Sequence, residues 1–159
     1  MSDLVAVTKM TLTEQFSSDL HVAMKAGDKI RVSTLRLLLA QIMNERISLK
    51  KDILSSEEEL KILQREIKKR KESAEMFTTG GRPLDAEKEL AEKNILEKYL
   101  PEQLSDNELE DIIRATISEN PSDTHVGKIT GRVMILAKGK TDGGRVKALV
   151  EKVLLLNSR

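Results

Sequence analysis

The stretch of the chain that most resembles a chemical motif is Gly-Lys-Thr at 139–141. These three residues match the end of a phosphate-binding P-loop, G-x-x-x-x-G-K-[ST], which follows a strand and opens a helix. The first glycine of that pattern would fall at Met134. The apolar residues before the motif have the spacing of one helix face, not of a strand: Ile129, Val133, Leu136 and Ala137. We therefore predict a turn between two helices, with Gly139 capping the first helix and Asp142 starting the second.

Other catalytic groups are sparse. Cysteine is absent, which removes thiol chemistry, disulfides and zinc–thiolate sites. His21 and His125 lack an H-E-x-x-H arrangement, and we expect both at the surface or its boundary. Carboxylates cluster where helices should begin, where they favour the positive end of the helix dipole. The sequence therefore predicts a protein that is not an enzyme and that has no catalytic residue, metal site or cofactor.

The charge distribution is more informative than the net charge of +1. Residues 101–123 contain seven acidic residues and one basic residue, whereas residues 124–159 contain eight basic and two acidic residues. Basic side chains beside a glycine turn and a helix N-terminus make a plausible phosphate-binding surface. The candidate nucleic-acid-binding residues are Lys128, Arg132, Lys138, Gly139, Lys140, Gly143, Arg145 and Lys147. The alternative is that the acidic segment packs against the basic one, so that the charges cancel internally.

Two further features limit how a nucleic acid could be bound. Aromatic side chains for base stacking are few, being Phe16, Phe77 and Tyr99, so RNA should be recognised by shape and backbone. A second basic run, "REIKKRK" at 65–71, would spread over most of a helix surface, and we expect a solvated face there.

The fold class is predicted to be all-α, because Leu, Ile, Lys, Glu and Ala dominate and aromatic residues are rare. Helix signals divide the chain into a flexible N-terminus (1–9), an N-terminal domain of four longer helices (10–100) and a three-helix C-terminal bundle (101–159). The expected helices cover about 11–26, 29–50, 55–77, 83–99, 106–119, 125–138 and 142 onward. Pro101 marks the boundary between the two helical domains.

The chain contains no apolar run long enough for a membrane span and no recognisable signal peptide. The absence of cysteine fits a reducing, cytoplasmic setting, although so short an N-terminus does not exclude a processed transit peptide.

Three stretches resemble the YqeY family: "VSTLRLLLAQIMNERI", the segment that contains "EKYLPEQLS", and "GKITGRVMILAKGKTDGGRVKALV". The resemblance covers about 10–158. It implies two helical domains, and a similarity to the tail domain of the B subunit of the tRNA-dependent amidotransferase (GatB), which helps to hold tRNA. The residues that the resemblance carries over as a tRNA-facing motif are Gly127, Lys128, Gly131, Lys138, Gly139, Lys140, Asp142 and Gly143. The chain departs from the family at 135–137, where relatives often have a proline-containing stretch.

The resemblance implies a non-catalytic, tRNA-associated accessory module, acting beside an aminoacyl-tRNA synthetase or amidotransferase complex. The family label of carbon–nitrogen ligase with glutamine as amido donor would then describe relatives. The alternative is a protein–protein adaptor without RNA affinity, with the N-terminal helices as its interface. A third hypothesis is an amidotransferase or another nucleotide-using enzyme.

Overall fold

The computed structural model describes residues 9–158, and these residues contain seven α-helices and no strand. The all-α prediction is confirmed. The helices are α1 (Leu12–Ala26), α2 (Lys29–Leu49), α3 (Ser56–Thr79), α4 (Pro83–Glu97), α5 (Asp106–Glu119), α6 (Val126–Ala137) and α7 (Gly143–Asn157). The predicted flexible segment 1–9 lies outside the described residues except for Lys9, which is exposed and has no regular secondary structure.

Local capping explains where most helices begin. Thr11 and Ser105 each form a capping box, in which the hydroxyl accepts from the N3 backbone N–H and the N3 glutamate accepts from the cap N–H. Asp28 caps α2 by accepting from the backbone N–H of Arg31. Pro83 occupies the first turn of α4, where its missing N–H costs nothing.

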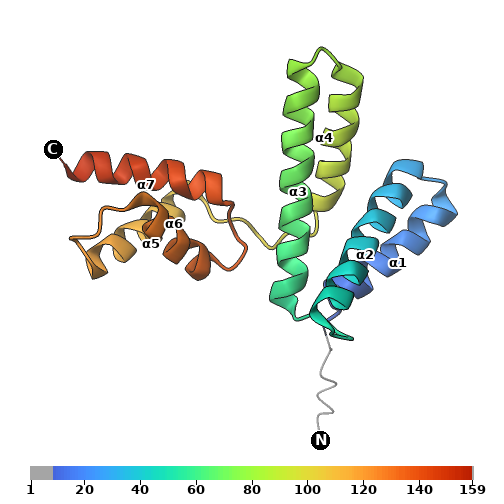
Figure 1. The fold of residues 1–159 in the computed structure, drawn as a ribbon, viewed down its shortest axis with the longest axis horizontal. Coiled ribbons are helices and arrows are strands. Elements are labelled where there is room, and N and C mark those ends of the chain that lie inside the picture. Colours follow the sequence, from blue (N-terminus) through green and yellow to red (C-terminus); the bar gives the residue numbers. More distant parts are fainter. Residues whose placement is uncertain (1–8, 159) are drawn as a thin grey trace, which may run out of the picture. The chain divides into compact units, whose positions relative to one another are not determined.

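Two compact units make up the chain, the first ending at Tyr99 and the second beginning at Leu100. In the first unit, α1 and α2 form one helical hairpin and α3 and α4 form another, and α2 packs on both α3 and α4 (Figure 1). Large apolar side chains fill its interior, including Phe16, Leu35, Leu38, Ile42, Leu63 and Leu96.

Helix α4 ends two residues earlier than expected, at Glu97 instead of Tyr99. Tyr99 lies beyond the helix, and its side chain packs back on α1. Its ring meets Phe16 edge to face at 4.8 Å, and its hydroxyl donates to Asp19 Oδ2 at 2.5 Å. Burial, and then the hydrogen bond to Asp19, raise the pKa of Tyr99 to about 12.

The expectation that 65–71 forms a solvated basic face is wrong for Arg70. This side chain is 4% exposed and donates from Nη1 to Glu66 Oε2 at 2.9 Å. Its Nε lies 3.1 Å from Glu92 Oε2 on α4, close enough for an ion pair but without hydrogen-bond alignment. Arg70 therefore joins α3 to α4.

In the second unit, α5, α6 and α7 pack against one another in pairs. Their common core consists of Leu109, Ile113, Ile117, Ile129, Val133, Val146, Val150 and Val153. This three-helix arrangement positions the residues that the sequence singled out.

Candidate nucleic-acid interface

Helix α6 directs one face into the core and leaves the other to solvent. Ile129, Val133 and Ala137 are buried, as their spacing predicts. Leu136 was expected on the same face but is exposed. The outer face carries Lys128 and Arg132, which are four residues apart and therefore lie side by side on the helix.

His125 is the N-cap residue of α6. Its Nδ1 accepts from the backbone N–H of Lys128 at 3.3 Å, which satisfies one of the unpaired donors at the helix start. His125 is exposed, as expected, but its role as a cap was not predicted, because histidine is an uncommon N-cap residue.

The Gly-Lys-Thr stretch forms the turn between α6 and α7. The helix ends at Ala137, and Lys138, not Gly139, takes the left-handed capping conformation, with φ 47°. Gly139 follows with φ 80°, which glycine adopts at little cost. Thr141 is 2% exposed, and its Oγ1 is buried without a hydrogen-bond partner. A helix before the turn and a buried threonine hydroxyl are both inconsistent with a P-loop.

The turn is held by the chain that enters the second unit. The backbone N–H of Leu104 donates to the carbonyl oxygen of Lys140 at 2.8 Å. Gln103 Nε2 donates to the carbonyl oxygen of Gly139 at 3.4 Å. Both contacts connect residues 36 apart in the sequence, so no local pattern could have indicated them.

The start of α7 is less open to an anion than expected. Asp142 accepts from the backbone N–H of Arg145 at 2.9 Å, so a carboxylate already occupies the positive end of the helix. Gly143 is the first residue of α7, and a Cβ atom added there would meet nothing within 4 Å.

Helix α5 neutralises part of the basic set. Asp106 accepts two hydrogen bonds from Arg145, at 3.0 and 2.6 Å. Glu119 pairs with Arg132 at 2.8 Å, and Glu110 pairs with Lys152 at 3.0 Å. The alternative of internal charge cancellation therefore holds for these three basic residues.

Four predicted site residues keep their charge available. Lys128, Lys138, Lys140 and Lys147 are exposed, and none forms a salt bridge within the part of the chain that the structure describes. Lys140 acts on α5 only at longer range. The pKa of Glu108 is lowered mainly by the backbone and hydroxyl of Ser105, and Lys140 contributes a smaller electrostatic effect.

The outer face of α6 also has open space beside the backbone of Gly131. A Cβ atom at Gly131 would meet nothing within 4 Å, and glycine in a helix interior is less stable than alanine. Packing within this unit therefore does not require a glycine at 131. Gly127, one turn earlier, is more restricted, because a Cβ atom there would lie 3.2 Å from His125 Cε1.

The sequence of this chain matches a known protein family. The family profile described as "Yqey-like protein" matches residues 13–154. The chain belongs to the YqeY family. A curated relative, "Altered inheritance of mitochondria protein 41, mitochondrial" from Pyrenophora tritici-repentis (strain Pt-1C-BFP), is 26% identical over 144 residues. The matched region covers 88% of this chain and 79% of the relative.

The YqeY resemblance inferred from the sequence is thus confirmed. The name of this relative places it in mitochondria, whereas the cytoplasmic setting expected for this chain remains a prediction. Across residues 9–158, no helix combines the length and the apolar character that crossing a bilayer requires. The same residues contain no group of three or more His, Cys, Asp or Glu side chains placed to hold a metal ion.

Proposed function

We propose that this YqeY-family protein is a cytoplasmic, non-catalytic accessory module that binds the backbone of tRNA through its C-terminal unit. The observation that carries the proposal is the selective pairing of charge on that unit. Acidic side chains of α5 pair with Arg132, Arg145 and Lys152, while four lysines on α6, on the turn and on α7 remain exposed without an ion pair among the described residues.

Backbone recognition fits this set of side chains. Lysines supply point charges to phosphates but carry no sequence information by themselves. The second unit contains no aromatic residue, so it offers no platform for stacking bases. Binding should therefore be strongly salt-dependent and should discriminate little between tRNA sequences. A complex with an aminoacyl-tRNA synthetase or amidotransferase would supply the chemistry and the specificity.

The direct test is binding of the purified protein to total tRNA, titrated across salt. Each phosphate contact should add roughly 0.7–0.9 to the log–log slope. The decisive variant reverses Lys128, Lys138, Lys140 and Lys147 to Glu. Arg132 is left unchanged because its partner Glu119 already accounts for it.

The matched control reverses four exposed lysines of the N-terminal unit: Lys61, Lys69, Lys71 and Lys88. Both variants change the net charge equally, so a nonspecific charge effect would weaken binding in both. Loss of binding in the C-terminal variant alone supports the proposal. Equal loss in both, or no binding by the unmodified protein at low salt, contradicts it.

A further inference from the structure

Helix α2 is apolar on two opposite faces. Its inner face buries Leu35, Leu38 and Ile42 in the core of the N-terminal unit. Its solvent-exposed surface carries four large apolar residues that are between 44 and 69% exposed: Ile30, Leu37, Met43 and Ile47. A helix that only covers a core has a polar outer face. The second apolar face therefore indicates an additional contact surface.

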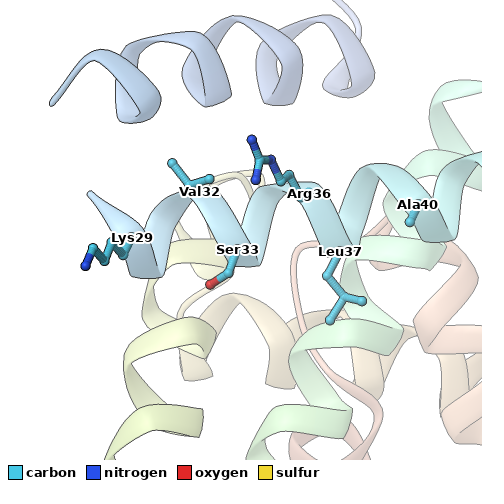
Figure 2. Close-up of a pocket in the computed structure, with 6 residues that line it drawn as sticks. All are labelled: Lys29, Val32, Ser33, Arg36, Leu37 and Ala40. Carbon is cyan, nitrogen blue, oxygen red and sulfur yellow. The ribbon is translucent and has the colours of Figure 1, made fainter. Parts of the chain in front are cut away.

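Two shallow grooves follow one another along this helix. The first has a volume of about 600 Å³ and is lined by Lys29, Val32, Ser33, Arg36, Leu37 and Ala40, as Figure 2 shows. The second has a volume of about 510 Å³ and is lined by Met43, Arg46, Ile47, Lys50, Lys51 and Asp52. The two grooves together extend over most of α2, whose 21 residues give a length of about 30 Å.

The charges that border the grooves are almost all positive. Within residues 9–158, Lys29, Arg36, Arg46 and Lys50 have no acidic partner. Arg36 Nη2 donates to the Met24 sulfur at 3.9 Å, and no salt bridge joins Arg36 to a carboxylate among the described residues. The Nε atom of Arg46 is buried and has no hydrogen-bond acceptor.

We propose that the outer face of α2 docks an amphipathic helix of a partner protein, with an apolar stripe edged by Asp or Glu. The apolar stripe would fill the grooves beside Leu37 and Ile47, and the acidic edges would meet the unpaired basic side chains. Hollows in line along a helix suit the ridges of a second helix better than a flat bilayer surface. RNA is a poorer occupant, because its phosphates would leave the apolar side chains without a partner.

This docking surface is independent of the proposed tRNA surface, because it uses only residues of the N-terminal unit. The chain would then carry two functions, an RNA contact on α6 and α7 and a protein contact on α2. If experiment contradicts the proposal for one surface, the proposal for the other surface is unaffected.

The test uses a display library of helical peptides about six turns long, matched to the length of α2. Each peptide has a fixed Leu stripe, and the flanking positions vary between Glu and Lys. The library is selected on the immobilised full-length protein. We expect enrichment of Glu-flanked peptides, and binding of the winners about tenfold weaker to the Leu37→Glu and Ile47→Glu variants. Both side chains are exposed, so the fold should be retained.

Two controls define what would overturn the proposal. Leu155→Glu changes an exposed leucine of the C-terminal unit and should leave peptide binding unchanged. Reversing Lys29, Arg36 and Lys50 to Glu should switch the preference to Lys-flanked peptides. No enrichment, no switch in preference, or equal selection by the Leu37→Glu protein would overturn the proposal. So would an α2-dependent contact that forms only with phosphatidylserine vesicles, with tRNA or with a second copy of this chain.

Discussion

Replacing Gly131 with alanine should make the C-terminal unit more stable. The residue lies in the interior of α6, a helix of 12 residues, where a new Cβ atom would meet nothing within 4 Å. The substitution therefore adds helix propensity without a clash, which is worth roughly 0.5–1 kcal/mol. In a unit of this size, that gain corresponds to a rise in melting temperature of about 2–8 °C.

The assay is thermal and urea unfolding followed by far-ultraviolet circular dichroism, because both units are helical. Gly139→Ala is the matched control within the same unit. Gly139 has φ 80°, a left-handed conformation that costs a residue with a side chain roughly 1 kcal/mol or more. The two variants make the same chemical change and should shift stability in opposite directions.

Binding supplies a second readout for Gly131→Ala. If tRNA backbone approaches the outer face of α6, the added methyl group should weaken binding although the protein is more stable. A fall in stability would refute the reasoning about the open space at Gly131. A stable variant with unchanged tRNA affinity would instead show that RNA does not approach this face.

Three further predictions concern buried or capping groups. The folded pKa of Tyr99, the only tyrosine, is raised from 10.0 to about 12, so its stabilising effect is complete below pH 10 and is lost as pH rises toward 12. Ultraviolet titration of the folded protein should find that midpoint. Glu108 has a lowered pKa, so its stabilising effect is present above its ordinary value of 4.5 and is lost as pH falls through the lowered value. Glu108→Gln can keep the capping box and should weaken the acid dependence of urea unfolding. Arg70→Met leaves Glu66 and Glu92 without their partner and should cost about 3–5 kcal/mol in urea unfolding.

Each of these predictions has its own control. Asp19→Asn should lower the titration midpoint of Tyr99, and a midpoint near 10 in the unmodified protein would mean that the phenol is solvated. An acid dependence unchanged by Glu108→Gln would show that this carboxylate does not titrate with folding. Lys69 is exposed beside Arg70, so Lys69→Met should have little effect on the free energy of unfolding. Equal losses of stability in the two variants would argue against a buried cluster around Arg70.

The helices could be predicted because their signals are local. The pairs Thr11 with Glu14 and Ser105 with Glu108 are three residues apart, and both capping boxes form as that spacing predicts. The periodicity of α6 likewise distinguished a helix from the strand that a P-loop requires. The packing of Tyr99 on α1 could not be predicted in this way, because its hydroxyl bonds to a residue 80 positions earlier.

The candidate site was predictable in composition but not in pairing. The sequence identified the basic residues, yet it could not say that Arg145 binds Asp106, 39 residues away, while Lys140 forms no ion pair among the described residues. In α2, the sequence likewise could not show which apolar residues are buried. Because both of its faces are apolar, periodicity could not indicate that Leu38 is buried and Leu37 exposed.

The hydrogen bonds from Leu104 and Gln103 to the turn at 139–140 define where the C-terminal unit can be separated as a module. The residues before α5 are part of its folded structure and do not serve only as a tether. A fragment or fusion that starts at Asp106 would keep all three helices but lose the support of the lysine-bearing turn. One that starts at Leu100 would retain it. The appropriate fusion boundary for joining this unit to another protein therefore lies at Leu100, six residues before its first helix.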